Sequence, residues 1–137
     1  MREVEVSRFV RATPAEVERA LTPAAVVEYE GSFSVVDSDE QADGSTVVTA
    51  GSRGLGLALR FEERDDGLYY TQEGDAGPFD AMETWVTVRS EDDGSRVTMR
   101  SSVSLGLPLA SLTDRLAAWK RKGELNRALD ALATDLG

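Results

Sequence analysis

Four neutral polar side chains, Tyr70, Gln72, Thr84 and Ser101, are best placed in this sequence to contact a bound molecule. They lie in stretches where polar and apolar residues alternate, as in a β-strand with one buried face. Hydroxyl groups and an amide can orient an apolar ligand through hydrogen bonds. They are not the paired titratable groups that general acid–base catalysis prefers. The pattern therefore favours ligand binding over catalysis.

Other reactive side chains are few. The chain contains no histidine and no cysteine, which excludes an imidazole base, a thiol nucleophile and the usual ligands of zinc. Asp37, Asp39, Glu40 and Asp43 have the composition of a calcium loop without its spacing. We therefore expect no metal site and no cofactor. Any catalysis would have to use carboxylates, Tyr, Lys, Arg or bound water.

The central hairpin determines which of these side chains face inward. Its turn contains Asp65, Asp66 and Gly67, and either a two-residue turn or a four-residue loop fits the sequence. Both registers place the same side chains on the apolar face, because side chains alternate with a period of two. The residues expected inside are Leu57, Leu59, Phe61, Leu68, Tyr70 and Gln72. Those expected outside are Arg60, Glu62, Tyr69, Thr71 and Glu73.

The last hairpin allows two registers with different consequences. A four-residue turn at Glu91–Gly94 pairs Val88 with Val97, places Thr84 and Ser101 inside, and is preferred for its apolar content. A three-residue turn or a bulge would instead bring Glu83 and Trp85 inward. In that second register Glu83, desolvated beside Trp85, could have a raised pKa and act as a base. Glu83 is thus the one weak catalytic candidate.

The chain begins with a strand at about residues 3–11, followed by two helix starts. Thr13, Pro14 and Glu16 form a capping box with proline at the first helical position. Thr22 and Pro23 repeat the cap and the proline. We expect two short helices, at about 14–21 and 23–29, because the ring of Pro23 would disrupt a continuous one.

Short strands separated by turn residues fill the chain from Gly31 to Ser104, with a polar loop over 38–45. With the first strand they make about seven, and the short hairpin connections predict an antiparallel sheet. A long helix follows and runs to Leu136. We expect one domain, residues 1–137, of the α+β class.

The long helix carries two apolar stripes on nearly opposite sides. The first is expected to face the sheet and close the cavity, and it contains Leu109, Leu112, Leu116 and Trp119. The second contains Leu125, Leu129, Leu132 and Leu136. It is expected to be covered by other parts of the same domain, with a homodimer or a bend of the helix at Gly123 as alternatives. Between the two stripes Lys120, Arg121 and Lys122 are interpreted as a solvated face, the alternative being contact with an acidic lipid or partner.

Three stretches of the sequence are similar to those of a known family: Val4–Val17 with its strand and Pro14 helix start, Gly77-Pro78-Phe79 followed by Trp85, and Gly94–Met99. With these stretches and its order of elements, the chain resembles the START-like superfamily, also called SRPBCC, which has the helix-grip fold. The local sequence is similar to the polyketide cyclase/dehydrase and coenzyme-Q-binding branches. The resemblance implies a curved seven-stranded antiparallel sheet around a long C-terminal helix. Family members bind lipids, polyketides, hormones and quinones, and some are enzymes.

We therefore expect this chain to bind a small apolar or amphipathic molecule, such as a lipid, polyketide or quinone, in an internal cavity. One alternative is a cyclase or dehydratase with Glu83 as the base and Tyr70 as a hydrogen-bond donor. Another is a partner-binding module whose core is filled by its own side chains. The expected ligand contacts are Phe61, Tyr70, Gln72, Thr84, Trp85, Ser101 and Trp119.

The net charge and the N-terminal sequence limit which partners and which cellular compartment we expect. A net charge of −10 disfavours nucleic acid, because phosphates would be repelled. No apolar run approaches the ~18 residues of a membrane span, and the first residues lack the apolar block of a signal peptide. We expect the cytoplasm. Acidic residues combined with only two lysines suit a high-salt, halophilic cytoplasm, although a GC-rich genome would also favour arginine.

Overall fold

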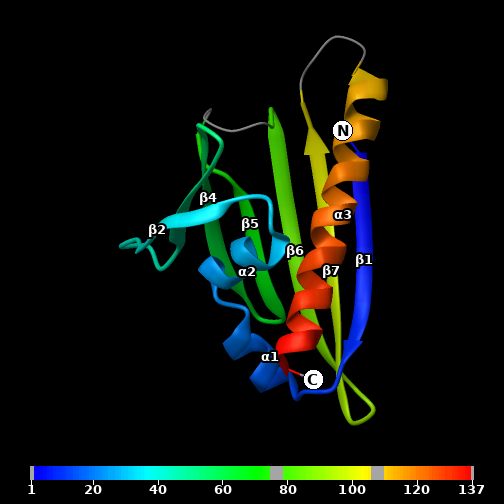
Figure 1. Ribbon diagram of the computed structural model, residues 1–137. Coiled ribbons are helices and arrows are strands. Elements are labelled where there is room, and N and C mark those ends of the chain that lie inside the picture. Colours follow the sequence, from blue (N-terminus) through cyan, green and yellow to red (C-terminus); the bar gives the residue numbers. More distant parts are fainter. Residues whose placement is uncertain (1, 75–78, 106–109, 137) are drawn as a thin grey trace.

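Seven strands form one antiparallel sheet in the computed structural model, which describes residues 2–74, 79–105 and 110–136 (Figure 1). The order across the sheet is β1-β7-β6-β5-β4-β3-β2. The strands are β1 (Arg2–Val10), β2 (Ser34–Glu40), β3 (Thr46–Ser52), β4 (Leu55–Arg64), β5 (Gly67–Gln72), β6 (Ala81–Glu91) and β7 (Gly94–Ser104). The predicted α+β helix-grip architecture is confirmed.

Three helices lie on the concave side of the sheet (Figure 1). The two short ones are α1 (Pro14–Ala20) and α2 (Pro23–Glu30), and each begins after a threonine cap, Thr13 or Thr22, as predicted. The long helix α3 (Ala110–Leu136) contacts β1, β7 and α2. None of the described helices is both long and apolar enough to cross a bilayer.

The hairpin registers agree with the inward and outward assignments made from the sequence. In the central hairpin Glu63 pairs with Leu68 and Phe61 with Tyr70, which is the four-residue alternative. In the last hairpin Val88 pairs with Val97, which is the preferred register. The polar loop expected over 38–45 is shorter, because β2 continues to Glu40 as an exposed edge strand.

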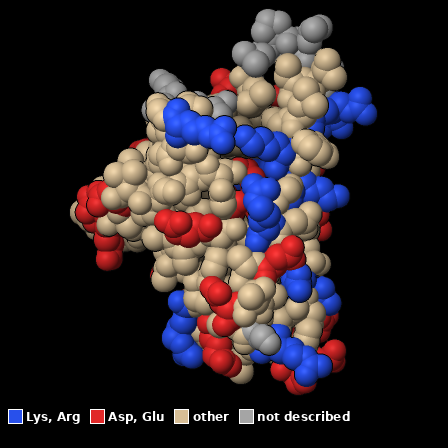
Figure 2. Space-filling model, viewed as in Figure 1, with Lys and Arg blue, Asp and Glu red and all other residues tan. Residues whose placement is uncertain are grey.

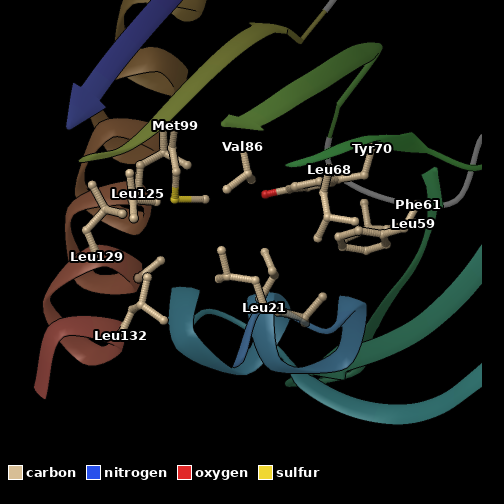
Figure 3. Packing of buried hydrophobic residues seen from close by; sticks show 14 of the residues in the cluster. Leu21, Leu59, Phe61, Leu68, Tyr70, Val86, Met99, Leu125, Leu129 and Leu132 are labelled. Atoms are coloured by element: carbon tan, nitrogen blue, oxygen red, sulfur yellow. The ribbon is translucent and has the colours of Figure 1, made fainter. Parts of the chain in front are cut away.

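The core lies between the concave face of the sheet and the three helices. Phe61, Tyr70 and Val86 of the sheet are fully buried, as are Leu125 and Leu132 of α3. In Figure 3 the Tyr70 side chain points toward the α3 side of the core, whereas Phe61 lies farther from α3, beside Leu59. The leucines expected to be covered by their own domain, Leu125, Leu129 and Leu132, are buried, and Leu136 is partly buried. No second chain is needed to cover them.

The other prediction for α3 is wrong. Leu112, Leu116 and Trp119 do not face the sheet and are 55%, 61% and 77% exposed, while Leu109 lies outside the described residues. A straight helix turns by about 100° per residue, so the face that carries the buried leucines also carries positions 121, 118 and 114 in the first half of α3. Those positions are Arg121, Ala118 and Asp114, and all three are buried. Arg121 is therefore inside the protein, whereas Lys120 and Lys122 are exposed as expected.

Candidate functional site

A guanidinium group lies in the core between α3 and the sheet. Arg121 is only 3% exposed and makes five hydrogen bonds of 3.1 Å or less to residues of the sheet, α2 and α3. Nη1 donates to Glu30 (2.6 Å) and Glu124 (3.1 Å), Nη2 to the hydroxyls of Tyr70 (2.6 Å) and Thr84 (2.9 Å), and Nε to Ser101 (3.1 Å). We call these six residues, including Arg121, the Arg121 network.

The register of the sheet assembles one side of the Arg121 network. Tyr70 of β5 pairs with Thr84 of β6, and Thr84 pairs with Ser101 of β7. The three hydroxyl residues therefore form a row across the inner face, perpendicular to the strands. The hydroxyls of Thr84 and Ser101 are 2.8 Å apart. The other side comes from α2, whose last residue is Glu30.

Burial and charge fix the protonation states of two members. Burial raises the pKa of Tyr70 far above its usual value, so its phenol stays protonated and donates to the Glu30 carboxylate. Burial opposes the charge on Arg121, but the interactions with Glu30, Tyr70 and Glu124 together outweigh it and raise the pKa. Arg121 therefore stays cationic. One guanidinium thus faces the two buried carboxyl groups of Glu30 and Glu124.

A small internal space borders this network. Its volume is about 20 Å³, which is about the room that one water molecule needs. Its polar lining comes from Glu30, Ser32, Arg121 and Glu124. Its apolar lining is Val27, Phe33, Leu57, Leu59, Phe79 and Met82. None of the seven predicted ligand contacts lines this space. It is nearly filled, and its polar end is charged, not neutral.

A larger cleft opens elsewhere on the same side of the sheet. It has a volume of about 480 Å³ and lies between the α1–α2 junction and the β4–β5 hairpin. Leu21, Phe61 and Leu68 line it, together with charged residues such as Arg19 and Asp65. The Phe61 ring stacks on Tyr70, with ring centroids 4.3 Å apart, and separates this cleft from the Arg121 network. The cleft has more room, but the smaller space has the convergent buried polar groups that define a binding site.

The predicted site residues divide into two groups. Phe61, Tyr70, Thr84 and Ser101 are buried together on the inner face. Gln72 is half-buried, and its amide binds the Phe79 backbone, donating to the carbonyl at 2.7 Å and accepting from the N–H at 3.2 Å.

The remaining candidates lie away from the internal space. The adopted register of β6 and β7 puts Glu83 and Trp85 on the outer face, where Glu83 accepts from the Tyr69 hydroxyl at 2.8 Å. The geometric basis for Glu83 as a cavity base is therefore lost. Trp119 is on the solvent side of α3, since the face that meets the sheet carries Arg121.

Sequence reasoning missed Glu30, Arg121 and Glu124, the three charged members of the network. For Arg121 a signal was available, because it lies one helical turn before Leu125 and on the same face. For Glu30 no local signal exists: it ends a short helix, and its partner is 91 residues away.

Comparison with known proteins supports the architecture. The profile of the family described as polyketide cyclase / dehydrase and lipid transport matches residues 1–137. A protein of Thermobifida fusca solved by NMR is 22% identical, with a TM-score of 0.76 and coverage of 100% of this chain and 94% of that one. No curated protein matches the chain.

Two further solved structures are similar in fold. The Zhui aromatase/cyclase of Streptomyces sp. R1128 is 14% identical, with a TM-score of 0.72 and coverage of 96% and 93% of the two chains. A START superfamily protein of Mycobacterium smegmatis is 13% identical, with a TM-score of 0.68 and coverage of 98% and 99%. At these identities the likeness concerns the fold alone.

Proposed function

The chain belongs to the polyketide cyclase / dehydrase and lipid transport family, and we propose that it binds a small amphipathic molecule between the sheet and the helices α2 and α3. The apolar part of the ligand would pack against Leu57, Leu59 and Met82. Its polar end would bond to the Arg121 network. The observation that carries the proposal is a buried charged network bordering an apolar space.

The energetic cost of the network supports a role in recognition. Moving an ion out of water costs several kcal/mol, and apolar side chains of similar volume often hold a fold at least as well as a buried ion pair. Arg121, Glu30 and Glu124 are therefore a poor means of stabilising the core. They suit a site where a polar group of a ligand must be bound away from water.

The charge of the network suggests the chemistry of that polar group. Glu124 accepts from Arg121 through Oε1, and Glu124 also lines the internal space. With one guanidinium against two carboxyl groups, the network can accept more hydrogen bonds than it donates. We therefore propose that the polar end of the ligand is a donor, such as an ammonium or a hydroxyl group.

Binding requires the lining to move, because the space has the volume of about one water molecule. Phe33 and Phe79 are only partly buried where they pack on the core. Met82 is unbranched and adapts easily to a new neighbour. A bound alkyl chain would occupy the position of these side chains.

Three probes of equal chain length test the proposal: hexylammonium, hexanol and hexanoate, added to the protein with labelled methyl groups. We expect saturable NMR shifts of the Met82 and Leu59 methyl groups with hexylammonium and hexanol, and weaker binding of hexanoate. In the variant Met82→Trp, which fills the space, the Leu59 methyl groups should no longer shift, whereas in Trp119→Ala both Met82 and Leu59 should keep their shifts. The absence of a saturable shift with all three probes would overturn the proposal.

One observation favours a second candidate, cyclase-type chemistry. The Tyr70 hydroxyl lies between the Glu30 carboxylate, to which it donates, and the Arg121 guanidinium, from which it accepts. Glu30 could remove a proton next to a carbonyl while the Tyr70 hydroxyl, turned from Glu30 to the substrate, donates to the developing enolate oxygen. The test is hydrogen–deuterium exchange at the α-carbon of 2-hexanone. Exchange accelerated by the protein and abolished by Glu30→Gln would support this role, and no acceleration would refute it.

A further inference from the structure

The first half of α3 presents an apolar stripe to solvent. Leu112, Leu116 and Trp119 are spaced four and three residues apart, so they lie on one side of the helix. They are 55%, 61% and 77% exposed. Single exposed apolar residues are ordinary, but an adjacent set that includes tryptophan marks an interaction surface. We call these three residues the α3 stripe.

The charges around the α3 stripe have one sign. Arg115, Lys120 and Lys122 are exposed, while the acidic residues of the same segment, Asp114 and Glu124, are buried. Both lysines of the whole chain lie here, in a protein with a net charge of −10. In Figure 2 basic side chains border the upper part of the molecule on both sides of α3, whereas most acidic ones lie toward the left edge and the lower end.

We infer that the α3 stripe and its basic border dock on the surface of an anionic lipid membrane. The leucines and Trp119 would enter the boundary between headgroups and acyl chains, where tryptophan is favoured. Arg115, Lys120 and Lys122 would face the anionic headgroups, which attract basic residues close to the surface. A symmetric dimer through the same stripe would bring the two basic borders together, so the charge pattern disfavours a second copy as the occupant.

The opposite edge of the sheet offers a second contact of the same kind. The turn between β3 and β4 lies at the same end of the molecule as the start of α3 (Figure 1). It carries exposed Arg53 beside Leu55, which is 54% exposed. The turn is tight, with positive φ at Arg53 (50°) and Gly54 (80°). One end of the molecule thus combines exposed apolar and basic side chains at two places.

This inference does not rest on the proposed ligand site, because none of its residues belongs to the Arg121 network. The docking would be peripheral, with the first half of α3 lying against the membrane surface. An amphipathic helix in this position is held by its apolar face together with electrostatic attraction. Both parts can be removed separately by substitution.

The test is sedimentation of the protein with vesicles of phosphatidylcholine alone and of phosphatidylcholine with phosphatidylglycerol. We expect binding to the anionic vesicles, a blue shift of tryptophan fluorescence that is lost in Trp119→Phe, and weaker binding at ~1 M than at ~0.1 M salt. Lys120→Glu with Lys122→Glu should weaken binding at least about tenfold. The matched control, Arg11→Glu with Arg89→Glu, reverses the same number of exposed charges at the other end of the sheet and should leave binding unchanged.

Several results would overturn the inference. These are equal binding to both kinds of vesicle, binding to neither, and equal effects of the two double charge reversals. A concentration-dependent dimer that protects Trp119 from quenching without lipid would assign the α3 stripe to a second copy of the chain. Circular dichroism of each variant confirms that a loss of binding is not a loss of folding.

Discussion

The two faces of the sheet carry similar residues in opposite surroundings. On the concave face Arg121 contacts Tyr70 and Glu30 in the core. On the convex face Arg100 lies 4.1 Å from the centre of the Trp85 ring, and Trp85 contacts Tyr69, which donates to Glu83. We call this second set, with Arg64 over Tyr69, the outer ladder. The adjacent residues Tyr69 and Tyr70 belong to opposite systems only because alternate side chains point to opposite faces.

Burial determines how much each of these contacts contributes to the free energy of unfolding. The outer ladder is partly exposed, so water and salt can replace each partner and each contact contributes about 0–1 kcal/mol. Arg121, Glu30 and Glu124 are each less than about 10% exposed, so a group that loses its partner there keeps most of the cost of its desolvation. The concave face should therefore respond strongly to single substitutions, and the convex face weakly.

The largest effect is expected for Arg121→Met. It leaves the Glu30 and Glu124 carboxylates in the core without a cation, which should lower the free energy of unfolding by ~3–5 kcal/mol. Arg100→Met, the matched change on the convex face, should cost no more than about 1 kcal/mol. Urea unfolding of both variants measures the difference.

A second variant separates charge from packing at this position. Replacing Arg121 by Met together with Glu30→Gln and Glu124→Gln removes the buried charges and should recover part of the lost stability. Similar costs for Arg121→Met and Arg100→Met would abolish the distinction between the two faces.

A smaller difference is expected between the neighbouring tyrosines. Tyr70→Phe removes the hydroxyl that donates to Glu30 and accepts from Arg121, and should cost ~1–3 kcal/mol. Tyr69→Phe removes a partly exposed hydroxyl that donates to Glu83, and should stay within about 0.5 kcal/mol of the wild type. Thermal unfolding resolves the two. A larger loss for Tyr69→Phe would contradict the assignment of the faces.

The sequence was sufficient to predict which side chains lie on each face of the sheet, but not to predict the Arg121 network between the sheet and the helices. Tyr70 inside and Tyr69 outside follow from a period of two, whatever the length of the turn. The register that pairs Thr84 with Ser101 followed from the apolar content of its inner face. Which side chains of a hairpin face inward depends on residues that are close in sequence, so the local sequence was enough to predict it.

The buried face of α3 could not be obtained in the same way. Its first half has Leu112, Leu116 and Trp119 on one side and Asp114 and Arg121 on the other, and apolarity favours the wrong side. The face is fixed instead by Leu125, Leu129 and Leu132 in the second half, since a straight helix cannot rotate between them. Arg121 is tolerated inside because the hydroxyl row of the sheet and Glu30 supply partners far away in sequence.

Salt should change the ion-pair energies of the two faces of the sheet differently, and we expect this difference to be smaller than the effects of the substitutions above. The coupling free energy between Arg100 and Glu3, which are 3.1 Å apart and half exposed, should fall toward zero between ~0.1 M and ~1 M salt. The coupling between Arg121 and Glu30 should change little, because ions do not enter the core. Double-mutant cycles at the two salt concentrations measure both. A coupling of Arg121 and Glu30 that salt removes would mean that water reaches the network.

The smallest effect concerns Arg60 and Glu73 on the convex face. Arg60 donates to both carboxylate oxygens of Glu73, at 2.7 Å and 3.1 Å, and these hydrogen bonds lower the pKa of Glu73. A carboxyl group whose pKa is lower in the folded than in the unfolded chain adds stability above its unfolded pKa of ~4.3, and loses it as the pH falls through the folded value. Arg60→Met should therefore reduce stability at neutral pH, and the difference from the wild type should vanish in acid.

Asp43 supplies the internal control for this last prediction. Its carboxylate also lies near Arg60, but the hydrogen bonds from Ser45 are the largest cause of its lowered pKa. In Arg60→Met, NMR titration of the carboxyl carbons should show the pKa of Glu73 rising toward its ordinary value while that of Asp43 remains low. A Glu73 pKa that stays low in the variant would mean that its hydrogen bonds with Arg60 are not formed in solution. Equal rises of the two pKa values would mean that the charge of Arg60 acts over a distance along the surface. Solvent would then not screen the charges of the convex face, and the expected difference between the two faces would be lost.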